Sequence, residues 1–250
     1  MGEWVRLAVG VVVLLAITLT VLSVGGIGHR AAAVVAVLRA VGQLALVAIV
    51  LRVVFTAPPA VVAVLAVMFS VAVWTAAGRL GGRALLRPVG LSCAAGAVVA
   101  IGIIVGLPVL SRDVRTLVAV SGIVVGGTMT ASTLAGRRLR DGLVRRRDEV
   151  EAALALGATP RQACRPIARS AVYEALVPAL DQTRTVGLVT LPGAFVGALL
   201  GGVGAVDAAR FQIVVLVGLL CAEAIAAALL AYLLGAPATL PLAVDGPGGG

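Results

Sequence analysis

Charged side chains stand inside long apolar runs of this sequence, where ionised groups are rare. Arg39, Asp181 and Glu223 are the main examples, and Arg184 and Thr185 follow Asp181 by three and four residues. That spacing lets the three side chains interact along one helix face. A charge inside a membrane-spanning segment usually faces a protein interior or an aqueous path, where it can hold an ion or relay a proton. Covalent catalysis is not indicated, because no nucleophile–base pair or cluster of metal ligands stands out.

Two of these charges also have a structural interpretation. Arg39 lies about 12 Å into its apolar run if a helix starts at Ala31, and its long side chain can extend back to the membrane surface. Gln43 follows one turn later on the same face. Glu223 lies midway along the last apolar run, where it is either protonated, paired with another helix or part of a transport path.

Residues that break helices surround the polar group at Asp181. Pro178, Gly187, Pro192 and Gly193 interrupt the helical pattern of the sixth apolar run. A broken helix at membrane depth is tolerated only where it is buried in protein or lines a cavity. We expect this segment to form part of a translocation path or its gate, with a kinked packing helix as the alternative. The full set predicted for the path is Arg39, Gln43, Met129, Asp181, Arg184, Thr185, Pro192, Gly193 and Glu223.

The composition indicates that lipid is the solvent for most of this chain. Of its 250 residues, 61% are hydrophobic and 12% are charged, whereas a soluble domain is about 45–50% apolar and about a quarter charged. The net charge of +9 is due to arginine, since the sequence has no lysine, and the arginines cluster between apolar runs. This distribution is typical of membrane topology and predicts no nucleic-acid partner.

Seven apolar runs are long enough to cross a membrane as helices. They cover residues 4–23, 31–55, 59–77, 89–109, 113–135, 172–200 and 209–234. Basic residues follow the first, third and fifth runs, which places the N-terminus outside and the C-terminus in the cytoplasm. The fold class is therefore all-α, a polytopic integral protein of the cell membrane with about seven transmembrane helices. We predict one transmembrane domain, residues 1–236, with a cytoplasmic loop at residues 136–170, and a disordered tail, residues 237–250.

The cytoplasmic loop contains the signals of a helical hairpin. Asp148 can cap a first helix, with Glu151 in the capping-box position, and Gly157 can adopt the left-handed conformation that ends it. Thr159 followed by Pro160 then starts a second helix, for which Gln162 completes another capping box. A capped hairpin in a cytoplasmic loop indicates a docking element. The alternative is a solvated basic loop that contacts anionic lipid.

The segment from Glu151 to Gly157 resembles the EAA loop of ABC-transporter permeases, the coupling helix that sits in a groove of the ATP-binding subunit. The wider stretch contains EAALALGATPRQA and ALVPALDQTRTVGLVTLPG. In this stretch the chain is similar to the FetB-type (YbbM-like) permeases, which are associated with iron export and related to plant aluminium-tolerance permeases. Arg169 and Ser170 stand where the general EAA pattern has Leu-Pro, so that general motif is matched in part.

The resemblance implies a permease subunit that exports iron or another metal ion. It also implies a homodimer, a separate ATPase subunit that binds ATP–Mg, and no cofactor or catalytic residue on this chain. A separate ATPase agrees with the absence of lysine, which a GxxxxGK[ST] phosphate loop requires. The residues implied for ATPase coupling are Asp148, Glu149, Glu151, Ala152, Ala153, Leu154, Gly157, Ala158, Thr159 and Pro160.

Three other functions remain open from the sequence. The first is an ABC permease for a non-metal solute. The second is a stand-alone secondary transporter or channel, in which Glu223 would be the coupling group. The third is a membrane scaffold or enzyme without transport activity. The sequence alone gives no set of residues that ligates a metal.

Overall fold

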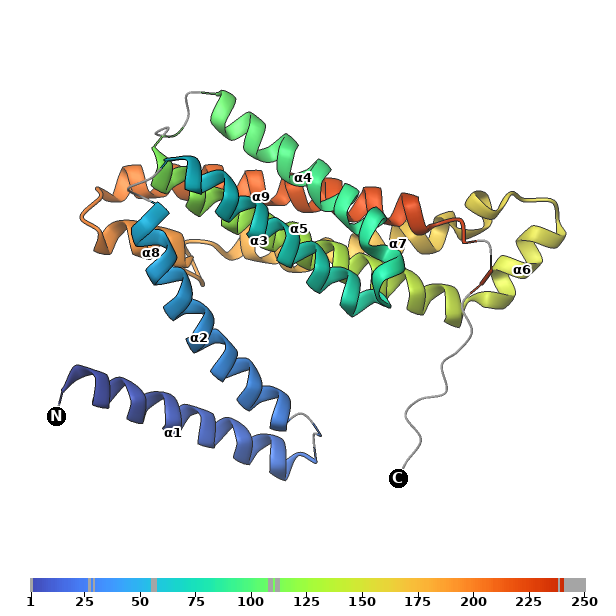
Figure 1. The fold of residues 1–250 in the computed structure, drawn as a ribbon. Coiled ribbons are helices and arrows are strands. Elements are labelled where there is room, and N and C mark those ends of the chain that lie inside the picture. The colour runs from blue at the N-terminus through green and yellow to red at the C-terminus, as the bar shows by residue number, and fades with distance from the viewer. Residues whose placement is uncertain are drawn as a thin grey trace. The chain divides into compact units, whose positions relative to one another are not determined.

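Runs of Val, Leu and Ala form long helices in this protein, because a helix satisfies its own backbone hydrogen bonds where water is absent. The computed structural model describes residues 2–26, 28, 30–54, 58–107, 110, 113–237 and 239–240. These residues form α-helices joined by short connections, without a β-strand among them (Figure 1). The chain divides into two compact units, Met1–Ala60 and Val61–Gly250.

The first unit is a pair of apolar helices, α1 (Glu3–Val24) and α2 (Arg30–Val54), which contact each other. Both are long and apolar enough to cross a membrane. Hydroxyl groups in α1 are satisfied within the helix, since Thr18 and Thr20 each donate to the carbonyl oxygen four residues earlier, at 2.9 Å. Such internal bonding suits a helix whose surroundings offer no water.

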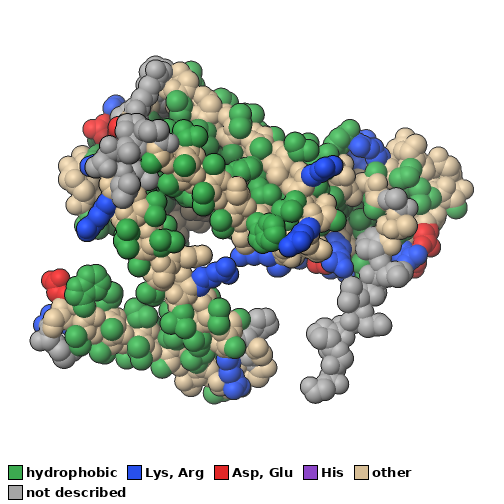
Figure 2. Space-filling model, viewed as in Figure 1, with side chains coloured by type: hydrophobic (Ala, Val, Ile, Leu, Met, Phe, Trp, Pro, Cys, Tyr) green, Lys and Arg blue, Asp and Glu red, His purple; other side chains and the backbone are tan. Residues whose placement is uncertain are grey.

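The second unit is a helical bundle built around α5 and α9. Its helices are α3 (Pro58–Leu80, from Val61 onward), η1 (Arg83–Leu85), α4 (Leu86–Gly106), α5 (Val114–Arg145), α6 (Arg147–Ala155), α7 (Pro160–Thr185), α8 (Gly193–Leu200) and α9 (Ala205–Leu234). Helix α9 packs against α4, α5 and α7, while apolar side chains of α3 fill the core beside α4 and α5. Hydrophobic side chains also cover much of the visible outer surface (Figure 2), as expected for a surface solvated by lipid.

Six helices of the described residues are long and apolar enough to span a membrane: α1, α2, α3, α4, α5 and α9. They correspond to the first five apolar runs and the last, so the all-α membrane fold is confirmed. The sixth run does not form a continuous helix. Helix α7 ends at Thr185, a turn follows, and α8 begins at Gly193. The predicted orientation of the termini stays a prediction, and residues 238 and 241–250 of the predicted disordered tail lie outside the described residues.

The fifth helix is longer than the sequence analysis predicts. That analysis ended the fifth run at Ala135 and began a loop at residue 136, but α5 continues to Arg145. The arginines end the apolar run without ending the helix, because Leu139 and Leu143, one turn apart, stay buried on its inner face. The predicted loop at residues 136–170 is therefore mostly helix: the end of α5, all of α6 and the start of α7.

Small residues allow the bundle helices to approach closely. A Cβ atom at Gly96 in α4 would lie 2.3 Å from the backbone oxygen of Ala222 in α9. A Cβ atom at Gly142 in α5 would lie 2.6 Å from a methyl group of Ile167 in α7. Membrane helices associate largely through such close packing of small residues. These contacts fix α9 against α4 and α7 against α5, and these are the helices that carry the candidate functional residues.

Candidate functional site

Helices α6 and α7 form a hairpin at one end of the bundle, next to the end of α5 (Figure 1). The corner of the hairpin is a Schellman motif, in which the Gly157 amide donates to the Leu154 carbonyl at 2.9 Å and the Ala158 amide donates to the Ala153 carbonyl at 3.0 Å. Gly157 has a φ of +90°, a conformation that side chains disfavour. The predicted glycine corner is therefore confirmed.

The predicted cap at the start of the hairpin is wrong. Arg146, not Asp148, occupies the N-cap position of α6, and its side chain makes no capping bond. Only this one residue separates α5 from α6, and the Val150 amide donates to its carbonyl at 3.2 Å. Because the backbone turns so tightly there, Asp148 lies within the first turn of α6 and Glu151 bonds to an arginine instead of capping.

The second predicted cap is confirmed. The Thr159 amide donates to Oε1 of Gln162 at 2.8 Å, and the Gln162 amide donates to Oγ1 of Thr159 at 3.4 Å. Pro160 occupies the first helical position, where it has no amide hydrogen to satisfy. This reciprocal capping box sets the point at which α7 begins, and hence the length of the corner between the two helices.

Replacing Thr159 by alanine should loosen the start of α7. Loss of an N-cap hydroxyl costs about 1 kcal/mol, so the amides of the first turn should exchange with solvent about fivefold faster. Hydrogen exchange followed by mass spectrometry measures this rate. Thr183→Ala is the matched control, because its hydroxyl bonds within α7 to the Ala179 carbonyl and caps nothing. Equal exchange at the α7 start in both variants would contradict the capping role.

A small apolar cluster holds the hairpin against α5. Val150 of α6 is 1% exposed, and it packs with Cys164 and Ile167 of α7 against Leu139 and Leu143 of α5. Val150 is the only fully buried residue of α6. The hairpin is therefore fixed through one face of a short helix, while its other face remains open.

The open face combines exposed apolar residues with organised charge. Leu156 at the tip of the hairpin is 89% exposed and Leu154 is 37% exposed. Nε of Arg146 donates to Glu149 at 2.9 Å and Nε of Arg147 donates to Glu151 at 2.7 Å. The hydrogen bond from Arg146 lowers the pKa of the Glu149 carboxyl below its ordinary value. A surface with an exposed leucine among paired charges is suited to docking into a groove on another protein.

Glu223 lies in α9 against a glycine of α5. A Cβ atom at Gly127 would lie 2.7 Å from Oε1 of Glu223 and 2.2 Å from a methyl group of Leu219. Glu223 is 9% exposed, and Thr128, which follows Gly127 in the sequence, is fully buried. Because glycine has no side chain, position 127 leaves the space that the carboxyl group of Glu223 occupies. This is the only acidic residue that the described part of the chain buries.

Met129, another residue predicted for the path, is not brought to Glu223 within the second unit. Met129 follows Gly127 by two residues, about 200° around the helix, and packs against the apolar clusters shared by α3, α4 and α9. Arg39 and Gln43 lie on α2, in the other unit of the chain, and are exposed. Within the second unit, Met129 has a packing contact rather than a polar one, which favours the structural interpretation of this residue.

The pairing predicted at the end of α7 is confirmed for the side chains of Asp181 and Arg184, but the Thr185 hydroxyl bonds to the backbone instead. Nη1 of Arg184 lies 3.6 Å from Oδ1 of Asp181, and the Thr185 hydroxyl donates to the Asp181 carbonyl at 2.8 Å. The side chains of this ion pair are exposed. Helix α7 ends at Thr185, and Gly187 then adopts a φ of +82°.

Two prolines of this region behave differently. Pro178 lies inside α7 and does not interrupt it, contrary to the sequence analysis. Pro192 occupies the N-cap position of α8, so that Gly193 is the first residue of that helix. The break in the sixth run therefore covers the residues between Thr185 and Gly193.

The break lines a cavity, and the sequence analysis did not include the α9 residue Gln212 in it. The cavity has a volume of about 280 Å³ and lies between the turn after α7, α8 and the start of α9. Gln212 of α9 lines it and is 5% exposed, and its Oε1 atom has no hydrogen-bond partner among the described residues. A buried amide oxygen without a partner can accept a bond from a ligand or from water. The sequence signal was available: a glutamine near the start of an apolar helix.

Comparisons with known proteins identify the family of this chain. The uncharacterised protein family UPF0014 matches residues 4–237. The chain belongs to the UPF0014 family. This match covers most of both units of the structure, including the α6–α7 hairpin, and reaches all six candidate membrane spans. No solved structure is significantly similar to the chain.

Curated relatives of this UPF0014 protein come from plants and bacteria. It is 38% identical over 204 residues to UPF0014 membrane protein STAR2 of Oryza sativa, and the aligned residues cover 79% of this chain and 70% of that protein. It is 37% identical over 179 residues to Protein ALUMINUM SENSITIVE 3 of Arabidopsis thaliana, covering 70% of this chain and 65% of that protein. It is 30% identical over 201 residues to Probable iron export permease protein FetB of Escherichia coli, covering 78% and 76%. These relatives confirm the resemblance inferred from the sequence.

Proposed function

We propose that this UPF0014 protein is the membrane-spanning permease subunit of an ATP-binding-cassette transporter. The observation that carries the proposal is the α6–α7 hairpin, a short helix with one buried face, a Schellman corner and a capping box. A rigid hairpin with an exposed leucine at its tip suits a groove on a partner ATPase. Movement of that partner on binding and hydrolysing ATP would be transmitted through the Val150 cluster to α5 and α7.

A separate ATPase is part of this proposal. The 250 residues include no lysine, so they contain no phosphate loop of the GxxxxGK[ST] type. ATP–Mg would therefore be bound by the partner. Each chain offers one hairpin, and ATPase subunits of this class act in pairs, so two copies of the permease are expected in a complete transporter. The homodimer and the cytoplasmic position of the hairpin belong to this proposal.

The proposed cargo is iron or another metal ion, moved out of the cell. Support comes from the relative named as a probable iron export permease, with 30% identity over most of both chains. No group of three or more His, Cys, Asp or Glu residues is placed to hold a metal among the described residues. A path that only transfers its cargo needs few ligands, and Glu223 and Gln212 are two of the buried polar groups that could make transient contact with it.

A secondary transporter is the second candidate, and the burial of Glu223 favours it. A carboxyl group packed between α5 and α9 could couple transport to proton movement. In that case the hairpin would have no partner to dock. An ABC permease for a non-metal solute keeps the same hairpin and differs only in its cargo.

Replacing the exposed leucine of the hairpin should release the ATPase. We expect Leu156→Asp to lower recovery of the candidate ATPase subunit by about tenfold in co-purification, since the aspartate would bury an unpaired charge in the groove of the partner. Leu156 is 89% exposed, so this change should leave the permease folded. Ala84→Asp in η1 adds the same charge at another exposed position and should retain the ATPase. Equal recovery with both variants would refute docking through α6.

A further inference from the structure

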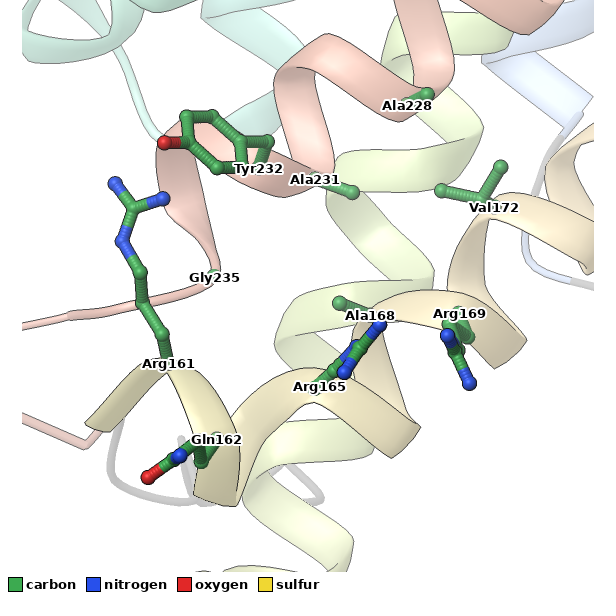
Figure 3. Close-up of a pocket in the computed structure, with 10 residues that line it drawn as sticks. All are labelled: Arg161, Gln162, Arg165, Ala168, Arg169, Val172, Ala228, Ala231, Tyr232 and Gly235. Atoms are coloured by element: carbon green, nitrogen blue, oxygen red, sulfur yellow. The ribbon is translucent and has the colours of Figure 1, made fainter. Parts of the chain in front are cut away.

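A cavity next to the hairpin lies between the first turns of α7 and the last turns of α9. Its volume is about 540 Å³, and it opens to the surface of the second unit (Figure 3). The α7 side contributes Arg161, Arg165 and Arg169, and the α9 side contributes Tyr232. Nothing in the proposed transport mechanism uses this cavity, which shares no lining residue with the cavity at Gln212 and does not include Glu223.

The three arginines face the cavity because of their spacing. Residues four apart lie one turn apart on the same side of a helix, so Arg161, Arg165 and Arg169 form a row along α7, as Figure 3 shows. The guanidinium group of Arg161 lies 3.9 Å from the centre of the Tyr232 ring. Within the part of the chain that the structure describes, none of these arginines forms a salt bridge with a carboxylate. Among the described residues, the row therefore presents positive charge that no carboxylate neutralises.

Apart from Gln162 at the start of α7, the rest of the cavity wall is apolar. Ala168 and Val172 of α7 and Ala228 and Ala231 of α9 lie between the arginines and the bundle. Helix α9 is a candidate membrane span that ends at Leu234, so this wall lies at the end of a span. Tyrosine is enriched at that level of membrane proteins, with its ring in the interface and its hydroxyl toward water. The cavity thus has a charged side and an apolar side at the membrane surface.

We propose that this cavity binds an anionic phospholipid, with its phosphate headgroup on the arginine row and its acyl chains along the apolar wall. A guanidinium group can donate two parallel hydrogen bonds to the oxygens of one phosphate, which the point charge of a lysine cannot. Three arginines in a row therefore suit the phosphodiester of a lipid headgroup. The apolar wall selects a lipid over a free phosphate, which would leave that surface exposed to water. Basic pockets between membrane helices on the cytoplasmic side are suited to anionic headgroups. This inference takes the cytoplasmic position of the hairpin from the proposed function, but it does not depend on the transported cargo or on the ATPase.

The test measures which lipid contacts the cavity. A tryptophan is placed in the cavity by Tyr232→Trp, after Trp4→Phe and Trp74→Phe remove the other two. The purified full chain is reconstituted in vesicles of phosphatidylcholine with increasing amounts of phosphatidylglycerol, each brominated in turn on its acyl chains. Quenching by brominated phosphatidylglycerol should exceed quenching by brominated phosphatidylcholine, corresponding to a relative affinity of about tenfold.

Two sets of arginine variants decide the source of that preference. Changing Arg161, Arg165 and Arg169 together to glutamine should abolish it, while quenching by phosphatidylcholine persists and shows that α9 still contacts lipid. Changing Arg137, Arg140 and Arg145 on α5 to glutamine removes the same charge outside the cavity and should retain the preference. The proposal is overturned if the cavity with its arginines intact shows no preference or if both sets reduce it equally. It is also overturned if no lipid quenches the introduced tryptophan, as when a protein surface covers the cavity.

Discussion

Gly96→Ala destabilises the bundle, whereas Gly102→Ala on the same helix does not: this is the first result we expect. A Cβ atom at position 96 would lie 2.3 Å from the backbone oxygen of Ala222 and 3.1 Å from a methyl group of Thr128. A backbone atom cannot rotate away, so α4 and α9 must separate. Overpacking of this kind costs about 1–3 kcal/mol, and more where backbone must move.

Thermal unfolding in detergent measures this effect. Gly102 has no atom within 4 Å of its Cβ position, so alanine there should keep or raise the midpoint, because alanine favours a helix by about 0.5–1 kcal/mol over glycine. The Gly96→Ala midpoint should fall by several degrees relative to this control. Similar midpoints for the two variants would show that α4 and α9 are not in the close contact described.

Val150→Asp should detach the hairpin from the bundle, with the largest effect expected for any residue of α6. The aspartate would stand in the cluster formed with Leu139, Leu143 and Ile167, where it has no partner. An unpaired buried charge costs about 3–5 kcal/mol, which would increase the open population by about a hundredfold to a few thousandfold. Cys164 reports this opening because it is 1% exposed and burial raises the pKa of its thiol.

The labelling rate of Cys164 with a thiol reagent, followed by peptide mass spectrometry, measures the opening. Ala152→Asp is the matched control, since it adds the same charge to the exposed face of the same helix. Labelling should be fast in Val150→Asp and slow in both the control and the wild type. If the two aspartate variants label alike, the hairpin is not held by Val150, and transmission of movement to α5 through this cluster fails with it.

Local patterns in the sequence predicted much of this hairpin. Gly157 and the Thr159–Gln162 capping box depend on bonds within a few residues, so the residue types alone indicate them. The prediction for Asp148 is wrong because only Arg146 separates α5 from α6. Asp148 is therefore already helical, and it cannot take the extended N-cap conformation. The α5 extension was missed because apolar content, not helical periodicity, set its predicted end.

Contacts between distant helices could not be predicted from the sequence. Glu223 was identified by its charge, but its position against Gly127 depends on how α9 packs on α5. The sequence assigns Gln212 to no site, because only the break after α7 creates the cavity that it lines. The sequence uses Arg161, Arg165 and Arg169 only to predict the membrane orientation. The packing of α9 beside α7 places them along one side of a cavity.

The most direct test of the central claim is transport by the purified chain together with its candidate ATPase subunit. Both are reconstituted in vesicles with the hairpin outward, and uptake of ferrous iron is measured with and without ATP. We predict uptake that requires ATP and both subunits, persists when the membrane potential is collapsed, and is lost with Leu156→Asp. Uptake by this chain alone, driven by the membrane potential and independent of ATP, would contradict the permease assignment and favour a secondary transporter.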